Sequence, residues 1–203
     1  MCIRDIISAM SLLLQKGGEN TREMGEQLFK IEQYVDLAMN YARLDSPSND
    51  FVIRRCSLDS VARQAIKKYA PLFIGKGIRV DFRETGLSVL SDEKWLCFSI
   101  EQIISNAIKY TPSGGSVTIW SPGDVELCIS DTGAGIAPED LPRIWERGYT
   151  GINGREDKRA SGIGLYLTRM ILTRLGHTVR AESVLGQGTT FTLGLESREI
   201  IAE

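Results

Sequence analysis

Three groups of residues, widely separated in the chain, are of the types that together bind a nucleotide. Asn106 lies in a segment with a helical pattern, Asp131 ends a strand-like run and opens an Asp-Thr-Gly-Ala-Gly sequence, and Gly162 and Gly164 precede another helical segment. An amide oxygen suits magnesium, which keeps several waters and is shared with substrate phosphates. A glycine-rich helix start presents free N–H groups and a positive dipole end to phosphate oxygens. Each group alone is common, but their combination predicts a nucleotide pocket.

Asp131 also predicts which base is bound. A carboxylate accepts a hydrogen bond from the exocyclic amine of adenine, whereas guanine presents a carbonyl at that edge. A buried charged group without its donor costs at least about 1–3 kcal/mol, which is enough to select the nucleotide. Gly133 and Gly135 permit close backbone approach and positive φ, and Ile136 follows them. Thr189, in a Gly-Gln-Gly-Thr turn, is a further candidate to donate its hydroxyl near the adenine.

The helix expected over residues 92–110 must position Asn106. Its apolar side chains recur at helical spacing and predict a core-facing stripe, formed by Ile100, Ile103, Ile104, Ala107 and Ile108. Gln102, Asn106 and Lys109 lie opposite, with Tyr110 at the edge. Lys109 would place a point charge near phosphates. Tyr110 would either stack on a purine or pack, and for Gln102 a solvated position is an equal alternative.

Gly162 and Gly164, followed by Leu165, match neither of the common phosphate loops. No Gly-Lys-Ser/Thr follows them, and no strand leads straight into them. The long connection over residues 136–160 is typical of a lid. Its basic residues could close on a triphosphate or form a solvated loop; they are Arg143, Arg147, Arg155, Lys158 and Arg159.

Composition limits the other functions. A net charge of −2 without a basic block argues against a nucleic-acid platform. No apolar run is long enough to span a bilayer, and no signal peptide is evident. The four cysteines lack paired spacing, which favours a reducing cytosol over disulfides or metal clusters. His177 is the single histidine.

The elements predicted for residues 1–46 form a helical hairpin. Helices are expected over 3–15 and 21–44, with a glycine break between them. The second helix carries two adjoining apolar stripes, which suits a helix buried among three neighbours and predicts a homodimeric four-helix bundle. The alternative is a hairpin that lies on its own domain. One stripe comprises Met24, Leu28, Ile31, Val35, Ala38 and Ala42, and the other Tyr34, Leu37, Tyr41 and Leu44.

After a linker over residues 45–50, the pattern becomes mixed α and β. Strands are expected over 51–55, 117–120, 125–130, 178–182 and 189–195, with a β-hairpin formed by 78–83 and 87–90. Helices are expected from a cap at Ser57 to about residue 74, from a cap at Asp92 or Ser91 through residue 110, and over 164–175. The prediction is an α+β domain over residues 51–203, preceded by the helical hairpin.

The order of these motifs closely resembles the sensor histidine kinases of bacterial two-component systems, and within them the kinases associated with peptide-antibiotic transporters. The matching segments are residues 101–112, 131–136, 144–147, 162–165 and 186–191. The resemblance implies a two-layer α/β sandwich of the Bergerat type, shared with gyrase, mismatch-repair and heat-shock chaperone ATPases, and it implies Mg²⁺ and ATP as cofactors. It assigns Mg²⁺ to Asn106, catalytic roles to Asn106 and Gln102, and ATP contacts to Asn106, Lys109, Tyr110, Asp131, Gly133, Gly135, Ile136, Gly162, Gly164, Leu165 and Thr189.

The resemblance also implies the reaction and the partners. The γ-phosphoryl group of ATP would pass to a histidine and then to the receiver domain of a response regulator. Residues 1–46 resemble the dimerisation and phosphotransfer hairpin, but the acceptor histidine would fall near Met1, where none stands. His177, between a helix and a strand, is expected to be a packed or surface residue. The chain is therefore expected to be a cytoplasmic portion that lacks its own acceptor, with any membrane anchor upstream.

Two departures from the family pattern concern the lid. Ala160 replaces a glycine that often begins the second glycine motif, and Gly148 follows Arg147 where an aromatic residue is frequent.

Gln102 stands where related ATPases have a glutamate that activates water, and an amide cannot act as a base. The hypothesis is that Gln102 discourages hydrolysis and preserves ATP for transfer. The alternatives are a non-catalytic ATP-sensing module and a hydrolytic ATPase of the same superfamily; a serine kinase resembling anti-sigma factors would share the pocket without needing the hairpin.

Overall fold

The computed structural model describes residues 21–44, 51–123, 125–151 and 161–196. The chain divides into two compact units, one of residues 1–49 with 153–160 and the other of residues 50–152 with 161–203. Across the described residues, no helix is both long enough and apolar enough to cross a bilayer.

Helix α2 (Thr21–Leu44) is the described part of the first unit, and it matches the helix predicted there. Part of one predicted apolar stripe is exposed, with Leu28 and Val35 each 48% accessible, and Met39 beside it is also exposed. The helix predicted over residues 3–15 and the linker over 45–50 lie outside the described residues.

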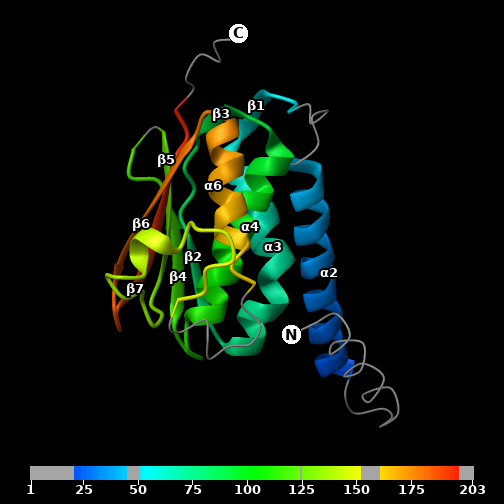
Figure 1. The fold of residues 1–203 in the computed structure, drawn as a ribbon, viewed down its shortest axis with the longest axis vertical. Helices are drawn as coiled ribbons and strands as arrows, with labels where there is room; N and C mark the ends of the chain where they lie inside the picture. The colour runs from blue at the N-terminus through cyan, green and yellow to red at the C-terminus, as the bar shows by residue number, and fades with distance from the viewer. Residues whose placement is uncertain (1–20, 45–50, 124, 152–160, 197–203) are drawn as a thin grey trace. The chain divides into compact units, whose positions relative to one another are not determined.

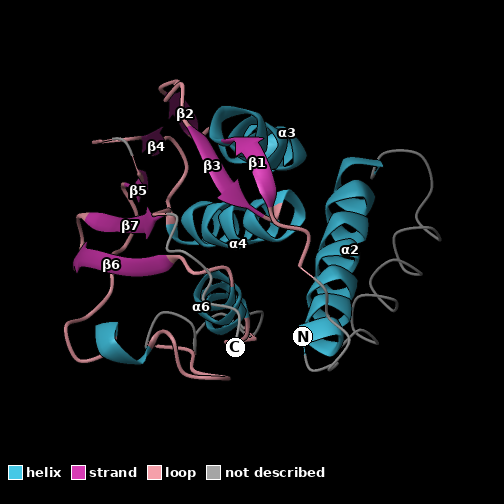
Figure 2. Cartoon of the chain, turned by 90° about the horizontal axis from the view of Figure 1, so that it is seen from above, coloured by secondary structure: helices cyan, strands magenta, loops and turns pink. Residues whose placement is uncertain are grey.

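A five-stranded sheet covered on one face by three helices forms the second unit (Figure 1). Figure 2 shows α3 (Leu58–Lys76), α4 (Glu93–Tyr110) and α6 (Gly164–Arg174) on the same side of this sheet. The strand order is β2-β4-β5-β7-β6, with only β2 and β4 parallel. The strands are β2 (Arg79–Phe82), β4 (Ser116–Trp120), β5 (Glu126–Asp131), β6 (Thr178–Val184) and β7 (Gly188–Gly194). A two-stranded sheet pairs β1 (Arg54–Ser57) with β3 (Ser88–Ser91), and η1 (Leu141–Arg143) is a short 3-10 helix.

The core lies between this sheet and its helices. The stripe predicted on α4 is buried throughout, and so are the alternate inward residues of β5 and β7. Full burial of one such aliphatic side chain contributes about 1.5–3 kcal/mol, so this layer outweighs any single polar contact in the unit. The inward strand residues are Leu127, Ile129, Phe191 and Leu193.

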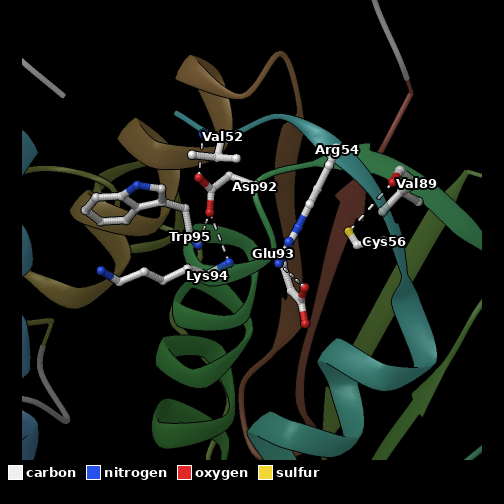
Figure 3. Close-up of polar contacts among 8 residues, drawn as sticks. All are labelled: Val52, Arg54, Cys56, Val89, Asp92, Glu93, Lys94 and Trp95. Atoms are coloured by element: carbon white, nitrogen blue, oxygen red, sulfur yellow. Dashed lines mark hydrogen bonds and ion pairs between the residues drawn. The ribbon is translucent and has the colours of Figure 1, made fainter. Parts of the chain in front are cut away.

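Both helix starts predicted from capping residues are confirmed. The Ser57 side chain accepts from the Ser60 N–H at the start of α3. At the start of α4, Asp92 Oδ1 accepts from the Lys94 and Trp95 N–H groups, while Oδ2 accepts from the Val52 N–H at 2.9 Å (Figure 3). One carboxylate therefore caps α4 and also holds the segment that leads into β1.

The predicted hairpin of residues 78–83 and 87–90 is wrong. β2 pairs in parallel with β4, whereas β3 pairs with β1 in the other sheet. The intervening turn is anchored instead by Asp59, which accepts hydrogen bonds from Thr85 and from the Gly86 N–H. The first strand also begins at Arg54 rather than at residue 51.

Candidate nucleotide-binding site

The end of α4 lies against the loop that follows β5. The Ala134 N–H donates to the Tyr110 carbonyl at 3.1 Å. A Cβ on Gly133 would lie 2.7 Å from that same carbonyl oxygen, so only glycine allows the two backbones to approach this closely. The segments that carry Asn106 and Asp131, separate in sequence, therefore meet in the fold.

Asp131 is buried, at 7% exposure, and its two oxygens have different surroundings. Oδ1 accepts from the Gly133 N–H at 2.8 Å and from the Thr189 N–H at 3.3 Å. Oδ2 makes no hydrogen bond with any residue that the structure describes. Burial raises the pKa of this carboxyl above its ordinary value, and the two backbone donors oppose that rise. One oxygen fixes the side chain while the other is available to an amine donor.

The turn between β6 and β7 is in close backbone contact with the loop that begins at Asp131. A Cβ on Gly188 would collide with the Asp131 carbonyl, and one on Gly135, at φ +68°, would collide with the Val184 carbonyl. Ser183, which sequence reasoning missed, accepts from the Ile136 N–H at 2.8 Å. No sequence motif marks Ser183, because its partner lies 47 residues earlier.

The polar residues expected opposite the apolar stripe of α4, Gln102, Asn106 and Lys109, are half-buried. The Asn106 carboxamide makes no hydrogen bond with any described residue, so its oxygen is available to a cation. The Lys109 ammonium lies 4.9 Å from the centre of the Tyr110 ring. Contact of Lys109 with phosphates and stacking of Tyr110 on a purine both stay predictions.

Gln102 meets the start of α6. A Cβ on Gly164 would lie 2.8 Å from Gln102 Oε1, which places this amide beside the glycine that begins the helix. Ile163 provides no side-chain cap, and within the described parts of the chain nothing accepts from the N–H groups of Gly164, Leu165 or Tyr166. Three uncapped N–H groups at the positive end of a helix fit an anion such as a phosphate.

The described base of the lid packs onto this glycine segment. The Gly148 N–H donates to the Gly162 carbonyl at 2.9 Å. The Tyr149 hydroxyl donates to Asp140, which is buried, and Trp145 packs edge-on against Phe191 with ring centres 6.0 Å apart. Sequence reasoning missed Asp140 and Tyr149 because neither belongs to a glycine motif.

The predicted basic lid residues are placed only in part. Arg143 pairs with Glu146 at 3.2 Å and lies over the Tyr149 ring. In this arrangement its guanidinium therefore interacts with residues of its own segment. Arg155, Lys158 and Arg159 fall outside the described residues. Closure of these side chains on a triphosphate stays a prediction.

Relatives and solved structures show what this arrangement is similar to. The chain is 37% identical over 197 residues to the sensor histidine kinase GraS of Staphylococcus haemolyticus, covering 94% of this chain and 57% of that protein. It is 30% identical over 195 residues to the sensor protein BceS of Bacillus subtilis, covering 94% and 58%. The chain thus spans somewhat over half the length of the curated relatives it matches.

Solved structures agree on the fold. Full-length ShkA, crystallised with AMPPNP, aligns with a TM-score of 0.68 and 25% identity, over 84% of this chain and 36% of that one. The mycobacterial sensor histidine kinase MprB aligns with a TM-score of 0.61 and 23% identity, over 70% and 97%, which supports the fold alone. Residues 91–199 match the model of the family described as histidine kinase-, DNA gyrase B-, and HSP90-like ATPase. The expected α+β fold and family resemblance are confirmed, and the chain belongs to this ATPase family.

Proposed function

We propose that this chain is the ATP-binding catalytic portion of a two-component sensor histidine kinase. It would donate the γ-phosphoryl group of ATP to a histidine, for relay to the receiver domain of a response regulator. The observation that carries the proposal is that α4 contacts both the loop that opens at Asp131, through the Tyr110 carbonyl, and the uncapped start of α6, through Gln102. The name of one relative, the sensor histidine kinase GraS, supports transfer to a histidine.

Different residues would bind the adenine, the phosphates and the magnesium ion. Asp131 Oδ2 would accept from the adenine amine, and the N–H groups at the start of α6 would hold phosphate oxygens. Asn106 would be a ligand of Mg²⁺, which when bound supplies neutralisation of phosphate charge. Phosphoryl transfer depends on such positioning and charge neutralisation more than on covalent assistance from the protein.

The acceptor histidine would be supplied by another polypeptide or segment. His177 is the one histidine in the sequence, and it is only 4% exposed, with Nε2 at 2.9 Å from Ser91 Oγ. A buried imidazole in this position has no access to a γ-phosphate. The chain is therefore expected not to phosphorylate itself.

Radiolabelled ATP tests the proposal directly. The chain is incubated with magnesium, labelled ATP and a separately produced helical hairpin that carries a histidine acceptor. The expected result is acid-labile phosphate on the hairpin and none on the chain. ATP binding with no transfer to any of several acceptor hairpins would favour a non-catalytic ATP-sensing module instead, and steady release of phosphate would favour a hydrolytic ATPase.

We further propose that α2 belongs to a hairpin that forms a homodimeric four-helix bundle. The exposed apolar side chains of Leu28, Val35 and Met39 support a second copy as the partner, since this segment resembles the dimerisation hairpin of sensor histidine kinases. The parent protein is expected to act at the cytoplasmic face of a membrane. Light scattering that found a strict monomer at all concentrations would contradict the bundle.

A further inference from the structure

The C-terminal end of α4 carries three of the side chains assigned to the nucleotide. Asn106, Lys109 and Tyr110 all lie within its final five residues. A helix end leaves its last carbonyls without intrahelical donors, and an end without partners frays. What satisfies these carbonyls therefore determines how rigidly the site is held.

The four carbonyls that follow Ala107 are all satisfied, and three of them by one side chain. The Lys76 ammonium lies 2.6 Å from the Ile108 oxygen, 3.1 Å from the Lys109 oxygen and 2.7 Å from the Thr111 oxygen. The remaining carbonyl, that of Tyr110, accepts from the Ala134 N–H. A positive charge at this position also complements the negative end of the α4 dipole.

Lys76 is itself held in place by the fold. It is the last residue of α3, and Gly77 ends that helix at φ +63°, with its N–H donating to the Ile74 carbonyl at 3.1 Å. Just beyond, the Arg79 N–H donates to the Gly115 carbonyl at 2.9 Å, which fastens the start of β2 to the connection after α4. The ammonium therefore reaches α4 from a fixed backbone.

The opposite end of α4 is secured by Asp92, which caps the helix and binds the Val52 N–H (Figure 3). With Lys76 at the other end, α4 is held by one charge-assisted group at each terminus, buried in the case of Asp92 and half-buried in the case of Lys76. Only the Lys76 end leads into the nucleotide site. Through Tyr110 and Ala134 it is also joined to the loop that begins at Asp131.

We propose that Lys76 is a positioning residue for the nucleotide site: its ammonium holds the C-terminal turn of α4 so that Asn106 and the Asp131 loop keep their mutual placement. The inference rests on the proposed ATP-binding function and adds a residue that does not itself touch the nucleotide. Charge-assisted bonds to three carbonyls predict that Lys76→Met weakens binding of magnesium-ATP by about tenfold or more.

The test is a calorimetric titration of the whole chain with magnesium-ATP, below the melting temperature of every variant. Lys76→Arg, which keeps a multidentate cation, is expected to bind within about threefold of wild type, and Lys76→Gln to fall between Arg and Met. Lys67→Met is the matched control, since Lys67 is an exposed lysine on the same helix. If the Met variant does not fold, the ranking of Arg over Gln decides the question.

A second control separates positioning from general stability. Asp59→Ala removes the anchor of the Thr85–Gly86 turn at the far end of α3, about 25 Å along the helix from Lys76. It should lower the melting temperature while leaving ATP affinity unchanged. Two results would overturn the inference while leaving the proposed function intact. One is a Lys76→Met variant that loses no more ATP affinity than Asp59→Ala at equal destabilisation. The other is a Lys76→Arg variant that binds magnesium-ATP no better than Lys76→Met. Failure of the wild type to bind ATP would overturn the proposed function, and the inference with it.

Discussion

At the scale of single residues, the two carboxylate oxygens of Asp131 have different roles: Oδ1 fixes the side chain, and Oδ2 is available to a ligand. Oδ1 is occupied by the backbone of Gly133 and Thr189, so the side chain cannot rotate without breaking two hydrogen bonds. These two hydrogen bonds fix the orientation of Oδ2, which can accept a hydrogen bond only from a donor. The sequence predicts an acceptor at this position, and the two backbone donors give that acceptor a fixed direction.

Gln102 allows a test of how the site avoids hydrolysis. Its amide oxygen lies beside Gly164, at the start of the helix expected to hold phosphate. Because a general base typically contributes about 10²–10⁴-fold, Gln102→Glu is expected to raise the slow ATPase rate by about tenfold or more. The measurement is phosphate release at saturating magnesium-ATP. Gln102→Ala, which removes the amide without adding a base, is the control, and an unchanged rate for Gln102→Glu would exclude this role.

At the scale of elements, the β6–β7 turn acts as a support for the Asp131 loop. Gly188, at φ +114°, lies too close to the Asp131 carbonyl for any side chain to fit. Gly186, in the same turn at φ +78°, faces open space. Both glycines therefore have a positive φ that disfavours other residues, but only Gly188 is also in close contact with a neighbouring backbone.

This pair gives a matched prediction. Gly186→Ala is expected to cost about 1–2 kcal/mol of unfolding free energy from the positive φ alone. Gly188→Ala adds a backbone collision and should cost clearly more, with a loss of ATP affinity as the Asp131 loop is displaced. Chemical denaturation and nucleotide titration measure the two effects. Equal destabilisation by both substitutions would contradict the close contact at Gly188.

Much of the element layout was predictable, and the failures have a physical reason. The helix over residues 92–110 was found because a local apolar period and the Asp92 cap lie within the segment itself. The hairpin of residues 78–90 was wrong because alternation specifies a strand but not its partner, which is β4 for one strand and β1 for the other. Lys76 was missed for the same reason, since its carbonyl partners lie 32–35 residues away.

At the scale of the whole unit, His177 makes stability depend on pH. Its imidazole joins the start of β6 to Ser91 at the end of β3, and so ties the two sheets together. Burial lowers the pKa of His177, and an interaction with the Glu196 backbone opposes this only in part. The unfolded chain therefore binds more protons at this group than the folded chain does.

The free energy of unfolding should consequently fall as the pH drops below the unfolded histidine pKa of about 6.5, with a slope of at most about 1.4 kcal/mol per pH unit. Denaturation midpoints of wild type and His177→Gln between pH 8 and pH 5 measure it. The difference between the two proteins isolates the histidine from Asp131, whose raised pKa acts in the opposite direction. A difference that is constant with pH would show that His177 is not buried as a neutral group.

We propose that Asp131 selects adenine, at a site that the end of α4 and the start of α6 complete. Calorimetric titration of wild type and Asp131→Asn with ATP and GTP, each with and without magnesium, tests it most directly. Wild type is expected to prefer ATP over GTP, and magnesium is expected to strengthen binding. Asp131→Asn is expected to lose about tenfold or more in ATP affinity, because a charged acceptor is replaced while Oδ1 keeps its backbone donors. Equal affinity for ATP and GTP, or an unchanged Asp131→Asn variant, would contradict a role of Asp131 in adenine selection.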